Sequence, residues 1–226
     1  KKDKIRALLK SIETGEPGPV TVVNEAKYIQ HNPQTHEGSE GLAVLFHRLS
    51  KTSPRVNIVR AYEDGDFVFA HTEYDFASRK IGFELFRFED GRAVEHWDNI
   101  QPRQGPNPSG RSMVDGPAES TDHALTETNR ALVRSFVETV LIKAKHDRLR
   151  DFVSEDGFNE HNPRSTDGVT ALKSALEETH NGHRVIDYQR MHRVVAEGNF
   201  VLSVSEGELG GKHSAFYDLF RIADGK

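Results

Sequence analysis

An aromatic-x-x-His-Asn-Pro phrase occurs twice in the sequence, once as YIQHNP ending at Pro33 and once as FNEHNP ending at Pro163. In each half an apolar-periodic segment of helical spacing precedes the phrase and another follows it. The helices predicted in this way are 1–12, 37–51, 124–153 and 166–180. A repeat of this length is the size of a domain rather than of a solenoid unit. The chain is therefore expected to contain two copies of one plan.

The segments that follow the helices also recur. Gly65 and Gly198 stand at matching places, each beside acidic or amide residues and flanked by β-rich runs, which predicts a tight hairpin in each half. Further along, FELFRFEDGR at 83–92 corresponds to FYDLFRIADGK at 216–226. Helices followed by long antiparallel strands favour an α+β fold, in which a mostly antiparallel sheet packs on helices.

The segment 102–117 separates the two copies. It contains four Pro and three Gly, a composition typical of an extended connection rather than of a helix or strand. We divide the chain into a first domain at 1–103, a linker at 104–122 and a second domain at 123–226. A single domain with one long loop is the alternative.

The composition excludes some classes of protein. With 226 residues, 35% hydrophobic and 29% charged, the chain is long enough to bury a core. Its formal net charge of −5 argues against nucleic acid or an anionic membrane as a partner, because either would need a basic face. No apolar run is long enough to span a bilayer and no signal peptide is visible, so we expect a cytoplasmic protein.

Two phrases of the first half, YIQHNP at 28–33 and GRAVEHWD at 91–98, resemble the SnoaL-like polyketide cyclases. More closely, they resemble the SnoaL-like aldol-condensation enzymes of the nuclear transport factor 2-like superfamily. The resemblance implies two tandem cone-shaped α+β barrels, each a curved sheet on helices with a pocket in its mouth. It further implies that the two sheets pack together as a pseudo-dimer within the chain, and it leaves a homodimer open. The superfamily holds isomerases, dehydratases, hydrolases and non-catalytic binders, so the resemblance does not fix a reaction.

The second copy departs from the first at its end. The sequence stops at RIADGK, where a counterpart of the VEHWD strand would begin. Either the chain continues beyond Lys226 or the second domain lacks its last strand. We favour the first alternative, because a sheet edge without a partner leaves backbone groups unpaired.

The segment AVEHWDNI carries the main catalytic candidates. Alternate side chains of a strand share a face, so His96 and Asp98 are expected together among apolar neighbours, with Trp97 on the other face. Apolar surroundings raise the pKa of a carboxyl, and a nearby imidazole can relay its proton. In the SnoaL cyclases an Asp on this late strand is the general acid and base, and the resemblance assigns that role to Asp98. A structural His96–Asp98 hydrogen bond is the alternative.

The His-Asn-Pro corners supply further candidates. Proline fixes its own φ and extends the residue before it, which makes each corner rigid. His31 and His161 then either tie the corner or face the pocket. We take His31 as the third catalytic candidate, orienting the substrate or stabilising an enolate oxygen. Tyr28 and Phe158 precede the histidines at equal spacing and are expected to line the pocket mouth.

Side chains of the strand predicted at 67–75 complete the pocket. Phe69 and His71 share one face of it, and His71 becomes Val204 in the second half, which favours a role in the pocket. The predicted substrate-binding residues are Tyr28, Phe69, His71, Trp97, Phe158 and His161.

Glu84 and Asp218 stand at matching positions beside phenylalanine rings. We expect them near the seam between the two sheets, and a desolvated acid is the alternative. The first-half histidines form no His-x-His or His-x-x-x-His pair, and the chain has no cysteine, phosphate-binding loop, dinucleotide fingerprint or serine-nucleophile motif. We therefore expect no metal and no cofactor.

These observations predict cofactor-free acid/base chemistry on a small, largely apolar carbonyl compound. The reaction types are aldol-type cyclisation, isomerisation and dehydration. The alternative is a non-catalytic module of the same fold that binds a small ligand or serves dimerisation.

Overall fold

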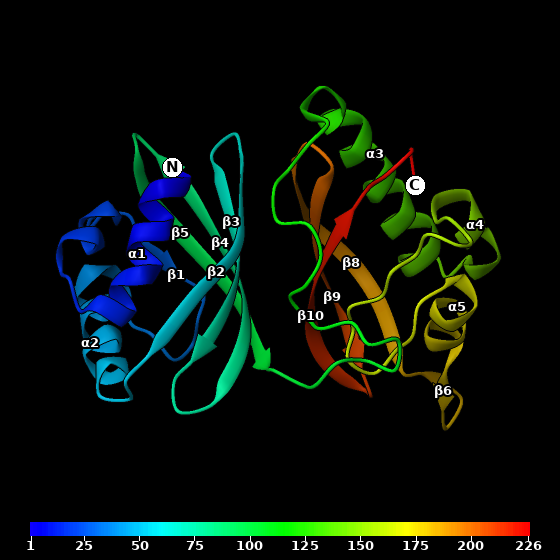
Figure 1. Ribbon diagram of the computed structural model, residues 1–226, viewed down its shortest axis with the longest axis horizontal. Coiled ribbons are helices and arrows are strands. Elements are labelled where there is room, and N and C mark those ends of the chain that lie inside the picture. Colours follow the sequence, from blue (N-terminus) through cyan, green and yellow to red (C-terminus); the bar gives the residue numbers. More distant parts are fainter. The chain divides into compact units, whose positions relative to one another are not determined.

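The computed structural model describes all 226 residues. The chain divides into two compact units, Lys1–Arg103 and Gln104–Lys226. In each unit helices lie on one face of a β-sheet, so the fold class is α+β (Figure 1). The segment 104–122 contains neither helix nor strand and belongs to the second unit.

The first unit is built around a five-stranded sheet. Its elements are α1 (Lys2–Thr14), a 3-10 helix (Gly18–Val22), β1 (Ile29–Gln30), α2 (Gly38–Ser50), β2 (Arg55–Asp64), β3 (Phe67–Asp75), β4 (Arg79–Glu89) and β5 (Arg92–Pro102). The strand order is β1-β5-β4-β3-β2, with β1 parallel to β5 and every other pair antiparallel. Because β1 and β2 lie at opposite edges, the sheet is open and does not close into the expected barrel. The helices predicted at 1–12 and 37–51 are confirmed.

Helix α1 follows directly from its sequence. Its large aliphatic residues recur at helical spacing and are buried: Ile5, Leu8, Leu9 and Ile12. The helix ends at Gly15, whose φ of 74° is left-handed and whose N–H donates to the carbonyl of Ser11. Burial of one aliphatic side chain contributes about 1.5–3 kcal/mol, so this face attaches the helix firmly to the sheet.

The second unit is built around a three-stranded sheet. Its helices are α3 (Thr126–Phe136), α4 (Leu149–Phe152) and α5 (Val169–Glu177), with 3-10 turns at His123–Leu125 and His146–Arg148 and a π-helix at Val137–Ile142. Its strands are β6 (Thr179–His180), β7 (His183–Arg184), β8 (Ile186–Glu197), β9 (Phe200–Leu209) and β10 (Lys212–Arg221). The main sheet has the order β10-β9-β8 and is antiparallel, while β6 and β7 form a separate ribbon.

Both predicted hairpins are present. Gly65 lies in the turn between β2 and β3, and Gly198 lies in the turn between β8 and β9. Their φ angles are 55° and 61°, in the left-handed region that glycine adopts without strain. The two predicted turns are therefore confirmed as turns between antiparallel strands.

The single long helix predicted at 124–153 is wrong. After α3 the backbone widens into the π-helix, and Ala144 then takes a left-handed φ of 52° before the chain reaches α4. This change of direction lets Val137, Val140 and Leu149 all enter the apolar core of the second unit. Tertiary packing therefore overrides a sequence of good helix formers.

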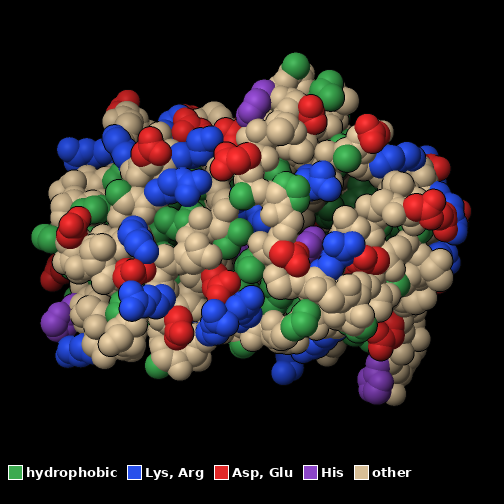
Figure 2. All heavy atoms as spheres, in the orientation of Figure 1, with side chains coloured by type: hydrophobic (Ala, Val, Ile, Leu, Met, Phe, Trp, Pro, Cys, Tyr) green, Lys and Arg blue, Asp and Glu red, His purple; other side chains and the backbone are tan.

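The surface carries charges of both signs. On the face shown in Figure 2, Lys and Arg side chains are interspersed with Asp and Glu side chains. No helix has both the length and the apolar character that a membrane crossing requires.

Candidate active site

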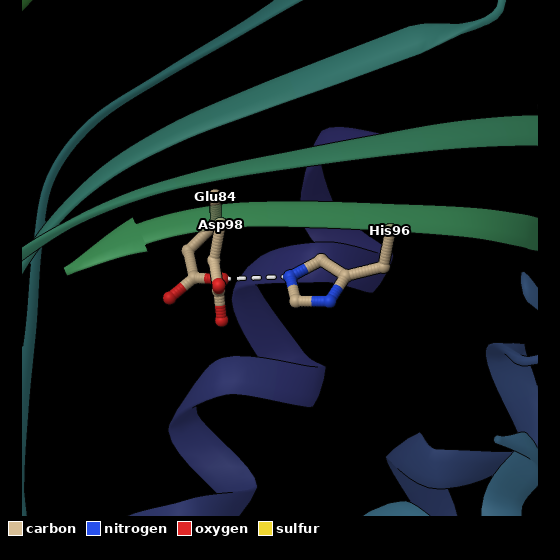
Figure 3. A group of neighbouring side chains, drawn as sticks. All are labelled: Glu84, His96 and Asp98. Carbon is tan, nitrogen blue, oxygen red and sulfur yellow. Dashed lines mark hydrogen bonds and ion pairs between the residues drawn. The ribbon is translucent and has the colours of Figure 1, made fainter. Parts of the chain in front are cut away.

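Three ionisable side chains meet on the helix-facing side of β4 and β5 (Figure 3). In the register of these strands, Glu84 is opposite Asp98 and Phe86 is opposite His96. Opposite residues of an antiparallel pair share a face, so all three polar side chains project toward the helices. Their possible ligand atoms lie within 4.8 Å of one another.

Glu84 and His96 form a buried pair. His96 Nε2 lies 2.8 Å from Glu84 Oε2, and the two residues are 6% and 4% exposed. The Tyr74 hydroxyl donates to the other carboxyl oxygen, Glu84 Oε1, at 2.7 Å. Burial, followed by the charge of Glu84, raises the pKa of Tyr74 well above its ordinary value. Tyr74 therefore remains a hydrogen-bond donor, and Glu84 is held at both oxygens.

The hydrogen bonds of Gln30 determine which atoms of His96 carry protons. Gln30 Oε1 accepts from the backbone N–H of Asn32 at 3.0 Å, so it is an acceptor toward His96 Nδ1 as well, at 2.7 Å. His96 Nδ1 is then a donor. The opposite nitrogen faces the Glu84 carboxyl, so His96 and Glu84 share one further proton. The pair is either imidazolium with carboxylate or neutral imidazole with carboxylic acid.

Asp98 is the accessible member of the group. It is half-buried, whereas Glu84 and His96 are buried. Asn32 Nδ2 donates to Asp98 Oδ2 at 2.6 Å and so orients the carboxyl. Loss of hydration, followed by the charge of Glu84, raises the pKa of Asp98, and His96 and Asn32 oppose this rise. A carboxyl with a raised pKa, held at one oxygen, is suited to exchange a proton through the other.

Tyr28 belongs to the same cluster. The residue is buried, and burial followed by the charges of Glu84 and Asp98 raises the pKa of its phenol well above the ordinary value. The phenol is therefore protonated at neutral pH and available as a donor near both carboxyls. The structure brings together three of the predicted residues, Tyr28, His96 and Asp98.

His31 was expected beside Asp98, and that expectation is wrong. Side chains alternate along β1, so Gln30 faces His96 and His31 faces the opposite side of the sheet. There His31 Nε2 lies 2.9 Å from Glu95 Oε1, and its ring stacks on Trp97 with the ring centres 4.8 Å apart.

Phe69, His71 and Trp97 also lie on the face away from Asp98. The Arg60 guanidinium donates to His71 Nδ1 at 2.7 Å, and the imidazole meets Phe83 edge to face at 4.6 Å. Phe69 meets the same Phe83 ring at 5.4 Å. The expectation that Phe69 and His71 line a pocket with Asp98 is therefore corrected, because strand alternation directs them to the other face, where Trp97 was expected.

The sequence reasoning missed several members of the cluster: Gln30, Asn32, Tyr74 and Glu84. A signal existed for two of them, since Gln30 and Asn32 flank His31 and must point opposite to it in an extended segment. Glu84 was expected at the seam between sheets, yet it faces the helices of its own unit through its bonds to Tyr74 and His96.

The second unit also has a carboxyl, Asp218, at the position that corresponds to Glu84, but its neighbouring residues differ. Asp218 lies on the same face as Phe220, whose ring meets Phe136 of α3 at 5.6 Å, so Asp218 also faces helices rather than a seam. The Tyr188 hydroxyl donates to Asp218 Oδ2 at 2.9 Å. Loss of hydration raises the pKa of Asp218 to about 6.

His161 and Phe158 serve the loop of the second unit. His161 Nδ1 lies 2.9 Å from the carbonyl oxygen of Ser112 and 2.8 Å from Asp115 Oδ1. The carbonyl of Phe158 accepts from the backbone N–H of Gly168 at 3.0 Å. These contacts tie the His-Asn-Pro corner to the segment before the unit's helices.

Glu84, His96 and Asp98 are also the residues that could hold a divalent cation, because carboxylate oxygen and imidazole nitrogen are common zinc ligands. A cation would have to displace the proton that Glu84 and His96 share. A separate open surface cavity of about 570 Å³ lies in the second unit and contains none of the predicted site residues. Its lining is formed by Arg164, Ser165, Thr166, Ala171, Ser174, Ala175, Glu177 and Glu178.

No protein-family model and no curated protein matches this sequence. Among solved structures, TsrD from Streptomyces laurentii is 19% identical with a TM-score of 0.38, over 45% of this chain and 90% of that chain. An NTF2-like protein of unknown function from Cytophaga hutchinsonii is 16% identical with a TM-score of 0.37, over 44% and 88%. A protein from Catenulispora acidiphila with a ketosteroid isomerase-like fold is 18% identical with a TM-score of 0.36, over 42% and 83%. Likeness at this level assigns no activity to this chain.

Proposed function

We propose that the first unit is a SnoaL-like, cofactor-free acid/base enzyme acting on a small, largely apolar carbonyl compound. The observation that carries the proposal is the half-buried Asp98, whose pKa is raised and which lies beside the buried His96–Glu84 pair. The phrases around Tyr28 and Asp98 that resemble the SnoaL-like proteins add to it.

Asp98 would remove a proton from the carbon next to the substrate carbonyl. Its Oδ1 receives the proton, and the electron pair of the C–H bond moves toward the carbonyl oxygen. The raised pKa of Asp98 makes its carboxylate a stronger base than an ordinary one. The Tyr28 phenol, which burial keeps protonated, would donate to the developing oxyanion.

The other members of the cluster would act as positioning residues. Asn32 fixes the Asp98 carboxyl through Oδ2. When the shared proton resides on His96, the imidazolium stabilises the anionic form of Asp98, which is the direction in which His96 shifts its pKa. Glu84 and Gln30 hold the two nitrogens of that ring, so the charge stays in place during proton transfer.

The enolate would then react in one of three ways. It could regain a proton at another carbon, attack a second carbonyl in an aldol ring closure, or expel a leaving group in a dehydration. The surroundings favour an apolar substrate, since the Phe86 ring stacks on His96 at 4.4 Å and belongs to the apolar core.

The test is proton exchange, which requires no knowledge of the final product. Small ketones and 1,3-diketones are incubated with the protein in D₂O, and loss of their α-protons is followed by NMR. The wild type is expected to accelerate exchange on at least one compound. Asp98→Asn is expected to lose that acceleration by about 10²-fold or more, a typical contribution of a general base.

Asp218→Asn is the control, since it makes the same substitution at a carboxyl of the second unit whose pKa is also raised. Folding of each variant is checked by circular dichroism, and folding of the first unit also by the fluorescence of Trp97, the single tryptophan of the chain. Full exchange activity in a folded Asp98→Asn variant would contradict the proposal. Saturable binding without any exchange would instead favour a non-catalytic ligand-binding module.

A further inference from the structure

Two histidines and a carboxylate meet on the sheet of the second unit, on the face away from its helices. Strands β8, β9 and β10 lie side by side (Figure 1), and they contribute His192, Glu206 and His213 respectively. Val201 of β9 belongs to the apolar core under the helices, so alternation along the strand directs Glu206 to the opposite face. The cluster is therefore separate from Asp218, which faces the helices.

Both imidazoles approach the same oxygen atom. His192 Nε2 lies 3.4 Å from Glu206 Oε2, and His213 Nε2 lies 3.5 Å from the same Oε2. A charge-assisted hydrogen bond between such groups is about 2.7–2.9 Å long. Two ligand atoms of a tetrahedral zinc ion, bound at about 2.0–2.2 Å, are separated by roughly 3.3–3.6 Å. The separations in this cluster are thus closer to those of ligands around a cation than to those of hydrogen bonds.

A β-bulge places His192 in the cluster. The register of β8 against β9 shifts between Met191 and Arg193, so His192 has no residue opposite it on β9. The extra residue of a bulge commonly serves to redirect a side chain. In this strand the bulge brings the imidazole of His192 beside Glu206.

The first unit has the same carboxylate and a bulge at the same place, but no histidine at either of the other two positions. Glu73 stands as far after the hairpin glycine of its unit as Glu206 does, and Val59 stands as far before it as His192 does. The register of β2 against β3 skips Val59 in the same way. Arg79 stands as far before the Phe-Arg pair at 86–87 as His213 does before the pair at 220–221.

Arginine neutralises this carboxylate in the first unit. Arg79 Nη2 and Arg103 Nη1 lie 3.2 Å and 3.1 Å from Glu73 Oε1. In the second unit Arg190 is opposite Glu206 in the register, yet the ion-pair partners of Glu206 are the two histidines. Arginine stays protonated and has no lone pair to donate, whereas neutral imidazole binds metals. The second unit therefore surrounds the carboxylate with metal ligands where the first unit surrounds it with fixed charges.

The cluster is open to solvent. The side chains of His192, Glu206 and His213 are 39%, 36% and 76% exposed, so a hydrated cation can reach them and the His213 ring can turn toward it. Two histidines and one glutamate are the donor set of several zinc enzymes, and they leave a fourth coordination position open. Sequence motifs do not reveal such a site, because its ligands come from three different strands.

We propose that His192, Glu206 and His213 bind a zinc ion, which links the three strands of the second unit's sheet. The ligands are both histidine Nε2 atoms and the Glu206 carboxylate, and solvent occupies the fourth position. The site lies in the other unit from Asp98, so it does not depend on the acid/base function proposed for the first unit.

The test is a titration of the chelator-treated protein with zinc alone at about pH 7.5, where histidine is largely neutral. Calorimetry measures the affinity, and NMR follows the histidine ring signals. The signals of His192 and His213 are expected to shift together and to stop shifting at one zinc ion per chain. Zinc should also raise the midpoint of thermal denaturation, because it binds the folded arrangement of the three strands.

Three variants test the ligands. His192→Ala and Glu206→Gln are each expected to weaken zinc binding at least about tenfold, since even the loss of a group that only supports a ligand has an effect of that size. His213→Arg reproduces the arginine of the first unit beside the carboxylate and is expected to weaken binding by at least the same factor, about tenfold. It changes an exposed side chain, so it keeps the test valid if another variant fails to fold.

The matched control removes two other exposed histidines, which are opposite each other in the β6–β7 ribbon. The double variant His180→Ala, His183→Ala is expected to bind zinc as the wild type does. The proposal is overturned if zinc shifts neither the His192 nor the His213 signal, or if the folded His213→Arg variant binds zinc as tightly as the wild type. It is also overturned if zinc shifts the His96 signal first, because the cluster of the first unit would then be the tighter site.

Discussion

In each unit a tyrosine hydroxyl donates to a carboxyl, Tyr74 to Glu84 and Tyr188 to Asp218, yet the groups beside the two carboxyls differ. In the first unit the buried Glu84 carboxyl shares a proton with the buried imidazole of His96. In the second unit, loss of hydration and, to a smaller extent, the charge of Glu160 raise the pKa of Asp218. The comparison shows that the electrostatics of such a site depend on the residues that the neighbouring strand and loop place beside the carboxyl.

The largest effect is expected from removing the imidazole that pairs with Glu84 in the first unit. His96→Leu leaves Glu84 buried without its partner, so we expect a loss of about 3–5 kcal/mol in the free energy of unfolding. Trp97 is the single tryptophan, so its fluorescence during urea denaturation reports on the first unit. A loss below about 1 kcal/mol would show that Glu84 does not depend on the imidazole.

The second unit should respond to pH through Asp218. Its folded pKa of about 6 exceeds the ordinary value of 3.8, so the folded state binds the proton more tightly than the unfolded state. Stability contributed by this group is therefore present below about pH 4 and is lost as pH rises toward about 6.

Asp218→Asn removes this dependence. Relative to the wild type, the variant should gain about 1–3 kcal/mol between pH 4 and pH 7, as measured by denaturation followed by circular dichroism. The same substitution at Asp98 tests the first unit in the same direction, because the pKa of Asp98 is also raised. A stability difference that stays constant with pH would contradict the raised pKa of Asp218.

Removing the tyrosine hydroxyl that donates to each carboxyl should cost a different amount of stability in the two units. Tyr74→Phe leaves a buried oxygen of Glu84 without its donor, and we expect a cost of about 1–3 kcal/mol. Tyr188→Phe should cost less, about 1 kcal/mol, because Asp218 is only half-buried, and it should raise the pKa of Asp218 further. Thermal denaturation and a carboxyl NMR titration measure the two quantities, and equal costs would contradict the difference in burial.

The smallest effect is expected at the paired histidines. His31 is largely solvent-accessible and His161 contacts its loop, so His31→Ala and His161→Ala should each cost about 1 kcal/mol or less. Neither change should alter proton exchange in the first unit. A tenfold loss of exchange in His31→Ala would restore the catalytic role that the sequence suggested.

Much of the fold could be predicted from local pattern. The hairpins at Gly65 and Gly198 and the helix at 37–51 follow from turn residues and apolar spacing. The break at Ala144 could not be predicted, because the residues around it favour a helix and only the packing of the second unit redirects the chain.

The site was predicted in part. Alternation along β5 placed His96 and Asp98 on one face, and the structure agrees. The position of Glu84 depends on the register of β4 against β5, which includes a bulge after Arg87 and cannot be derived from either strand alone. The two-residue strand β1, which decides that Gln30 rather than His31 faces inward, is too short to leave a periodic signal.

The most direct test of the account is the pKa of Asp98 itself. Aspartate side chains labelled with ¹³C are titrated by NMR, and the Asp98 signal is identified by its absence in Asp98→Asn. The account predicts a pKa above the ordinary value of 3.8, because the carboxyl has lost hydration and lies beside Glu84. A pKa at or below 3.8 would contradict it.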